Sequence, residues 1–215
     1  MTTALILDFD GTVLDTEGPI FHGWRELYAE HGVELDLPTW QQTIGTADDP
    51  DHFANLEAAV GPLDPSWRAW RRRRRDELLH AEEIRPGVLA WLDEAEALDI
   101  PVGIASSSPI DWVARHLDRL GLTERFACLA CCNEVIPAKP DPMSYRLACE
   151  TLGARPERSI AVEDSPHGVA AATGAGLLTV AVPHGLTSSL DLSAADLVVG
   201  SLADITLGEV VAARH

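Results

Sequence analysis

Short apolar runs bounded by turn residues recur along this chain, and they alternate with segments whose apolar residues lie three or four positions apart. The runs have the length of buried strands, and the other segments have the period of helices that cover a sheet. Repeated strand and helix units predict an α/β fold with a Rossmann-like parallel sheet. The expected strands are residues 3–10, 102–105, 127–130, 160–162, 178–182 and 197–199, and the expected helices are residues 88–98, 110–120, 143–152 and 168–175.

An insertion with a different pattern separates the first two expected strands. Residues 17–83 show no strand pattern, and their apolar positions follow helical spacing, as Ile20, Trp24 and Leu27 do on one face of a first helix. A helical segment placed after the first strand of a parallel sheet predicts a cap over the sheet. We therefore expect a discontinuous α/β catalytic core of residues 1–16 and 84–215 and a helical cap domain of residues 17–83.

The first strand runs into Asp8-Phe9-Asp10-Gly11-Thr12, which holds two carboxylates separated by one apolar residue. Residues two apart in a strand project to the same side, so Asp8 and Asp10 can approach one metal ion or one substrate. Later strands run into Ser106-Ser107-Ser108 and into Glu163-Asp164-Ser165. Ligands of open parallel sheets bind beyond the carboxyl ends of the strands, so these segments predict a single site at that edge.

The amino-acid composition limits the classes of binding partner and the cellular location that we expect for this protein. The 215 residues include 34 acidic and 16 basic side chains, and the formal net charge of −18 repels nucleic acid. The sequence has no apolar run of 18 residues and no basic head before a long apolar stretch, so we expect no membrane partner and a cytoplasmic location. The four cysteines lack the paired spacing of a zinc site and are expected to be buried free thiols. We expect a monomer or a weak dimer.

The single lysine of the chain, Lys139, stands out against 15 arginines. It lies between prolines in the segment 136–142. An ammonium group is a compact point charge on a flexible stem, and it fits beside a phosphoryl oxygen or a carboxylate where a planar guanidinium would not. The retention of one lysine therefore favours a role for its ammonium group in a crowded site.

These residue types fit the hydrolysis of a phosphate monoester. Asp8 can supply an oxygen nucleophile, but its carboxylate repels a phosphate dianion, so a cation is needed between them. Mg²⁺ prefers oxygen ligands, which Asp8, the Asp10 carbonyl and the pair Glu163-Asp164 can supply. The Asp10 side chain can then protonate the leaving alcohol and later activate water. The groups expected to bind the phosphoryl oxygens are the Ser106 hydroxyl, the Ser107 amide and Lys139.

The segments 8–17, 85–88, 104–108, 138–142 and 162–176 together resemble the haloacid dehalogenase superfamily, in the branch with a small helical cap that holds phosphoglycolate phosphatases and beta-phosphoglucomutases. The resemblance covers essentially the whole chain. It implies a Mg²⁺-dependent phosphatase that hydrolyses a small phosphorylated metabolite through an aspartyl phosphate. The residues it implies are the nucleophile Asp8, the acid/base Asp10, the phosphate ligands Ser106 and Lys139, and the Mg²⁺ ligands Asp8, Asp10, Glu163 and Asp164.

Departures from related patterns exclude some reactions and leave others open. Dehalogenases of the superfamily carry an aromatic residue in place of Asp10, so halide displacement is not expected. Phosphonate hydrolases of similar build use a cap lysine, and this cap contains none. Sugar phosphate mutases carry a histidine and a cation where this chain has Ile20 and Ile44, so a beta-phosphoglucomutase-like transfer stays the alternative. A catalytically idle fold that binds a protein is a third possibility, disfavoured because no core residue is lost.

Six of the seven basic residues of the cap fall within residues 68–75. On a helical wheel, Arg71 and Arg74 share a face with apolar residues of the same helix. We therefore expect at least one of them to bind the substrate phosphate or a second anionic group. The other arginines of the run 71–75 are expected to form a solvated face, and they are Arg72, Arg73 and Arg75.

Overall fold

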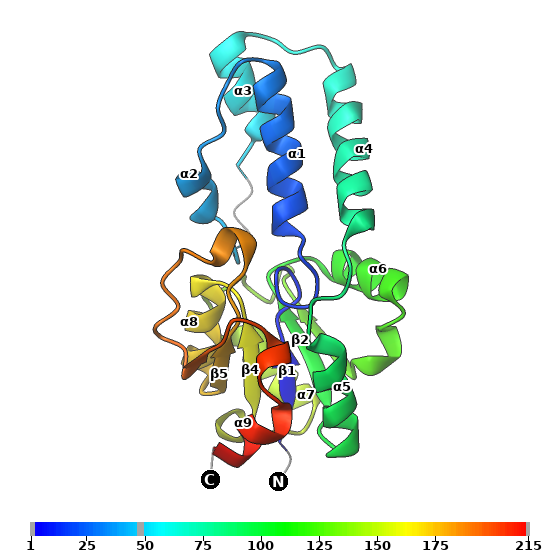
Figure 1. The fold of residues 1–215 in the computed structure, drawn as a ribbon, viewed down its shortest axis with the longest axis vertical. Helices are drawn as coiled ribbons and strands as arrows, with labels where there is room; N and C mark the ends of the chain where they lie inside the picture. Colours follow the sequence, from blue (N-terminus) through cyan, green and yellow to red (C-terminus); the bar gives the residue numbers. More distant parts are fainter. Residues whose placement is uncertain (1–2, 47–49, 214–215) are drawn as a thin grey trace.

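The computed structural model describes residues 3–46 and 50–213, and it consists of a sheet with flanking helices and a group of helices at one end of that sheet (Figure 1). Residues 1–2, 47–49 and 214–215, which the expected domain ranges include, lie outside the described residues. Among the described residues, no helix has the length and apolar character needed to cross a membrane.

The sheet confirms the expected α/β fold class. Its strand order is β3-β2-β1-β4-β5-β6, and every neighbouring pair is parallel. The first strand is central, with Leu7 in register with Ile104 on one side and Val162 on the other. The carboxyl ends of these three adjacent strands consequently lie at one edge of the sheet, where Asp8 follows β1, Ser106 is the last residue of β2 and Glu163 is the last residue of β4. The strands are β1 (Leu5–Leu7), β2 (Val102–Ser106), β3 (Cys128–Cys131), β4 (Ile160–Glu163), β5 (Leu178–Ala181) and β6 (Leu197–Val198).

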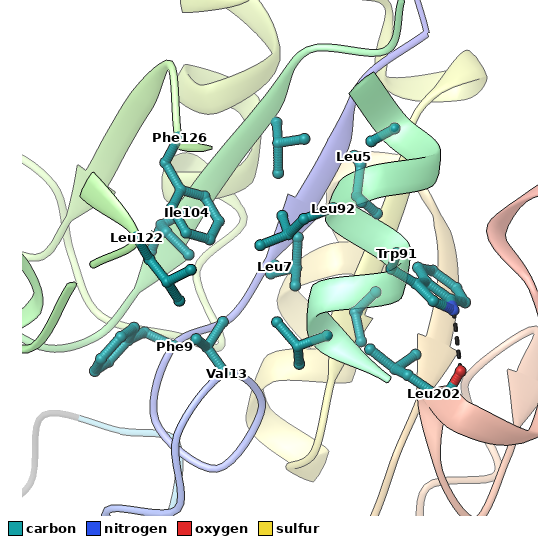
Figure 2. Close-up of a cluster of buried hydrophobic side chains, with 14 of the residues drawn as sticks. Leu5, Leu7, Phe9, Val13, Trp91, Leu92, Ile104, Leu122, Phe126 and Leu202 are labelled. Atoms are coloured by element: carbon teal, nitrogen blue, oxygen red, sulfur yellow. Dashed lines mark hydrogen bonds between the residues drawn. The ribbon is translucent and has the colours of Figure 1, made fainter. Parts of the chain in front are cut away.

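Helices cover both faces of the sheet, as the near-continuous apolar strands require. Alternate side chains of β1 point to opposite faces of the sheet. Leu5 and Leu7 pack with the helices α5, α6 and α9, whereas Ile6 packs with α7 and α8. Figure 2 shows the first of these clusters, in which the buried indole of Trp91 donates to the Leu202 carbonyl. The covering helices are α5 (Val88–Ala97), α6 (Ile110–Leu120), α7 (Met143–Thr151), α8 (Pro166–Ala175) and α9 (Leu207–Ala213).

The insertion after β1 folds into helices that stand beyond the carboxyl ends of the strands (Figure 1). The two long helices pack side by side, and aromatic and leucine side chains such as Trp24, Leu27 and Leu56 fill the space among the helices. Asp36 and Asp51 accept hydrogen bonds from backbone amides at the starts of the two short helices. These helices are α1 (Glu17–Glu30), α2 (Leu37–Gln41), α3 (His52–Val60) and α4 (Ser66–Ala81).

Two stretches of chain connect the helical group to the sheet region, and they lie next to each other. Leu14 and Ile84 form an antiparallel bridge, and the Arg85 amide donates to the Val13 carbonyl. On the core side, Arg119 of α6 donates to backbone carbonyls at the end of α4. The connection is therefore narrow, and its position is held by backbone hydrogen bonds.

Candidate active site

The predicted residues Asp8, Lys139 and Glu163 come together in the interior at the carboxyl edge of the sheet. The Lys139 ammonium donates to Asp8 Oδ1 and, at 2.6 Å, to Glu163 Oε1. All three residues are buried, and the Lys139 residue is only 3% exposed. Burial alone would lower the pKa of Lys139, but the two carboxylates outweigh that effect and raise it. The ammonium group is therefore held charged against both acids.

Every oxygen of the Glu163 carboxylate has a donor. The Tyr145 hydroxyl of α7 donates to Oε1 at 2.6 Å, and the Asp164 amide donates to Oε2 at 3.2 Å. The Ser165 hydroxyl lies 3.4 Å from Oε2 and also accepts from the Gly168 amide, which caps α8. Glu163 is thus fixed in place by its own strand, by α7 and by the start of α8.

Two carboxylate oxygens in this cluster differ from those of Glu163. Asp8 Oδ2 and Asp164 Oδ2 are buried, and neither has a hydrogen-bond partner among the described residues. A buried charged oxygen without a partner is costly, and a bound cation would remove that cost. Carboxylate oxygens of Asp8, Glu163 and Asp164 lie within 4.8 Å of one another, a grouping that could hold a metal ion. Oxygen ligands of this kind suit Mg²⁺.

The charge of the cluster leads to the same conclusion. When ionised, three carboxylates face one ammonium group, so negative charge is in excess. Burial, followed by the neighbouring carboxylates, raises the pKa of Asp8 and of Asp164 well above the ordinary value, although Lys139 acts in the opposite direction. A bound divalent cation would remove this excess and keep both aspartates ionised.

Gly11 allows the chain to pass close to this cluster. Its φ is +90°, and a Cβ atom at this position would lie 2.1 Å from Asp164 Oδ2. Any larger residue would displace the Asp164 carboxylate or the turn that follows Asp10. Gly11 thus allows the turn after Asp10 and also allows the backbone to pass close to Asp164, the predicted metal ligand.

Asp10 lies beside the cluster with its carboxylate already hydrogen bonded. Oδ1 accepts from the Thr16 hydroxyl at 2.7 Å and from the Trp112 indole N–H at 2.8 Å. Oδ2 accepts from the Ser108 hydroxyl at 2.7 Å and from the Ser106 hydroxyl at 3.3 Å. The donors come from the residue before α1, from the end of β2 with the loop after it, and from the first turn of α6, so the carboxylate is held by three segments.

The two serines predicted to bind phosphate are close to the cluster, but their hydroxyls have other partners. Ser106, besides its contact with Asp10, accepts from the Ser108 amide. The Ser107 hydroxyl accepts from the Lys139 amide at 3.1 Å and donates to the carbonyl of Gly45, in the cap, at 2.8 Å. Ser107 therefore joins the cap to the loop that carries Lys139, and its backbone amide remains the group predicted to bind phosphate.

A cavity of about 770 Å³ lies between the cap helices and the carboxyl edge of the sheet. On the core side it is lined by Asp10, Ser107, Ser108 and Trp112. On the cap side aromatic residues and arginines predominate. This volume is within the range of sites that enclose small molecules. The cap-side lining includes Trp24, Trp40, His52, Phe53, Arg68, Arg71, Arg72 and Arg75.

The structure separates the two cap arginines that the sequence placed together. Arg71 is buried against α1, where it donates to the Ile20 carbonyl at 2.9 Å, and its guanidinium lies over the Trp24 ring while also lining the cavity. Arg74 forms a two-point ion pair with Glu26 and is not part of the cavity lining. Of this pair, only Arg71 is placed to contact a bound molecule.

Several residues of the site were not identified from the sequence. Thr16 lies inside a recognised segment, but its contact with Asp10 was not foreseen. Trp112 and Tyr145 are helical residues whose spacing resembles that of ordinary core positions, and no signal distinguished them. Arg72 and Arg75, expected to be solvated, line the cavity. All four cysteines are free thiols and partly or fully buried, as expected. Burial raises the pKa of Cys128, Cys131 and Cys149.

Comparison with known proteins places this geometry in context. A family model described as haloacid dehalogenase-like hydrolase matches residues 2–176. YhcW of Bacillus subtilis (strain 168) is 38% identical over 209 residues, which cover 96% of this chain and 95% of the relative. The phosphorylated carbohydrates phosphatase of Thermotoga maritima is 28% identical over 212 residues, covering 97% and 96% of the two chains.

A solved structure of similar fold carries a ligand. CbbY from Rhodobacter sphaeroides, crystallised as a mutant in complex with xylulose-(1,5)bisphosphate, is 28% identical and matches with a TM-score of 0.75. The match covers 97% of this chain and 98% of that one. The likeness therefore extends over the cap as well as the sheet.

Proposed function

The chain belongs to the haloacid dehalogenase-like hydrolases, and we propose that it is a Mg²⁺-dependent phosphatase that hydrolyses a small phosphorylated metabolite through an aspartyl phosphate. The observation that carries the proposal is the buried group of Asp8, Lys139, Glu163 and Asp164, with two carboxylate oxygens that lack partners among the described residues. The names of the Thermotoga maritima and Rhodobacter sphaeroides proteins support phosphorylated sugars as the first class to test.

Asp8 is the proposed nucleophile. Its Oδ1 atom is held by Lys139, which leaves Oδ2 as the atom available to attack phosphorus or to bind the cation. Asp8, Glu163 and Asp164 would hold Mg²⁺, with the Asp10 carbonyl as a further ligand. When bound, Mg²⁺ would neutralise charge between the nucleophile and the phosphoryl oxygens. Lys139 and the Ser107 amide would bind the remaining phosphoryl charge.

Asp10 is the proposed general acid and base. It would protonate the leaving alcohol and later take a proton from the water that hydrolyses the aspartyl phosphate. Its carboxylate reaches the cavity, and four donors hold it in place. On substrate binding, one or more of these donors must release Asp10 so that it can contact the leaving group. Arg71 is the proposed cap residue in contact with the substrate.

The test is phosphate release from a panel of phosphate esters with Mg²⁺, compared with the same reactions in EDTA and with an Asp8→Asn variant. We expect turnover by the wild type that is lost in both controls. Release that persists in Asp8→Asn would refute an aspartyl phosphate. The beta-phosphoglucomutase-like alternative predicts an isomerised sugar phosphate in place of free phosphate, and ³¹P NMR of the products distinguishes the two.

A further inference from the structure

Four arginines of α4 face the cavity on one side of the helix. They are Arg68, Arg71, Arg72 and Arg75. With 3.6 residues per turn, these positions fall within an arc of about 100°, whereas positions 73 and 74 fall outside it. Arg72 and Arg73 are both exposed, but only Arg72 is part of the cavity lining. The arginines are therefore sorted by the helix into a cavity group and an outer group.

Three of the cavity arginines retain capacity to bind an anion. The Arg68 guanidinium carbon lies 4.3 Å from the centroid of the Phe53 ring, and no carboxylate partner is found among the described residues. Within the same described part, Arg72 has neither an ion pair nor a hydrogen bond. Arg75 uses two of its nitrogens on the neighbouring Asp76, and its side chain is 33% exposed. Arg71, by contrast, is engaged with α1.

The positive charge is local in a strongly acidic protein. The chain has a formal net charge of −18, yet the described lining of the cavity contains four arginines and two acidic residues, Asp10 and Glu17. The acids come from the region where the chain enters the cap, whereas the arginines lie on α4. Arg68 and Arg72 lack a carboxylate partner among the described residues, and a bound anion would offset the repulsion between such neighbouring guanidinium groups.

We propose that Arg68, Arg72 and Arg75 form a second anion-binding subsite, so that the substrate is a phosphorylated sugar with a second phosphate group. The inference rests on the proposed function, in which the first phosphate is bound beside Asp8. A phosphate is favoured over a carboxylate because its terminal oxygens and double charge match several guanidinium forks at once. Between the two anionic groups, the aromatic lining of the cap would contact the sugar.

The experiment compares substrates that share a scaffold: ribulose 5-phosphate with ribulose 1,5-bisphosphate, and fructose 6-phosphate with fructose 1,6-bisphosphate. The double variant Arg72→Gln, Arg75→Gln removes charge from the subsite, and Arg73→Gln removes the same kind of charge from the outer face of the helix. We expect kcat/KM of the double variant to fall about 10–100-fold for a bisphosphate and by less than about 3-fold for the matched monophosphate. Arg73→Gln should leave both values unchanged.

Other outcomes separate this inference from the proposed function. Turnover of monophosphates with no preference for bisphosphates, or an equal loss for both classes in the double variant, would refute the subsite while the phosphatase stands. A preference for 6-phosphogluconate over both bisphosphates would refute the second phosphate in favour of a carboxylate. If no ester is hydrolysed, calorimetric titration of Asp8→Asn with each bisphosphate decides: binding that Arg72→Gln, Arg75→Gln abolishes supports the subsite, and absence of binding refutes it.

Discussion

Replacing Asp164 with asparagine should raise the unfolding temperature in the absence of Mg²⁺ and should reduce the stabilisation that Mg²⁺ gives. Carboxylate oxygens of Asp8, Glu163 and Asp164 lie within 4.8 Å of one another. Two unit charges at that separation repel by about 3.5 kcal/mol at an effective dielectric constant near 20, and Lys139 offsets part of this. Because Asp164→Asn removes one charge, we expect the metal-free protein to gain about 1–3 kcal/mol at neutral pH. In a chain of this size, the gain corresponds to roughly 2–12 °C in Tm.

The pH dependence follows from the raised pKa values of Asp8 and Asp164. In the metal-free wild type, the folded state keeps protons that the unfolded state has released. Stability therefore falls as pH rises from the ordinary aspartate pKa of 3.8 through the raised pKa values of the folded state. Asp164→Asn removes one of the two groups, so its metal-free stability should fall less over the same range. A matched control is Asp118→Asn, which alters an exposed carboxylate on α6.

Mg²⁺ should reduce the advantage of Asp164→Asn over the wild type. A ligand present at 100 times its Kd stabilises the folded state by about 2.7 kcal/mol, and a tenfold loss of affinity removes about 1.4 kcal/mol of that effect. Differential scanning calorimetry in EDTA and then in Mg²⁺ gives the two increments. A lower Tm for Asp164→Asn in EDTA, or an Mg²⁺ increment equal to that of the wild type, would show that Asp164 is not a repelled metal ligand.

Three further substitutions test other contacts. Burial lowers the pKa of His116, so the unfolded chain gains a proton below about pH 6.5 before the folded one does, and stability should fall from pH 6.5 to 5. His116→Leu should make that fall smaller, which urea unfolding midpoints measured across this pH range would show. Trp112→Phe keeps an aromatic ring but removes the hydrogen-bond donor to Asp10, and we expect kcat to fall about 3–10-fold with KM unchanged. A change confined to KM would contradict a positioning role for Trp112. Tyr145→Phe leaves a buried oxygen of Glu163 without one donor and should cost about 1–3 kcal/mol in urea unfolding, while a neutral result would contradict the importance of that contact.

The sheet and the centre of the site could be predicted because they depend on local patterns. Apolar runs located the strands to within a few residues, and parallel strands bring their carboxyl ends to one edge. Asp8, Ser106 and Glu163 therefore had to meet once the strand order placed β2 and β4 beside β1. Lys139 was singled out by composition, since it is the one lysine of the chain.

The positions of the cap arginines could not be predicted from sequence patterns alone. A helical wheel gives the angles between side chains but not the direction in which a cavity lies. In the structure, the face with Arg71 packs against α1, where a Cβ atom on Gly23 would lie 3.4 Å from that guanidinium, so the neighbouring face turns to the cavity. Trp112 and Tyr145 were missed for a related reason, because their polar atoms reach the site only through the packing of α6 and α7 on the sheet.

The central position of β1 also has a consequence for the order in which the protein forms during synthesis. Residues 8–101 separate β1 from β2, and β4 is made later still. At about 5–20 residues per second, the ribosome takes roughly 5–20 s to make that stretch, and the apolar strand meanwhile has no partner. Helices α1 and α4 complete their contact within the first 81 residues and can fold during this interval. The apolar residues of β1 therefore stay without their final partners until β2 and then β4 have been made and the sheet can close around them.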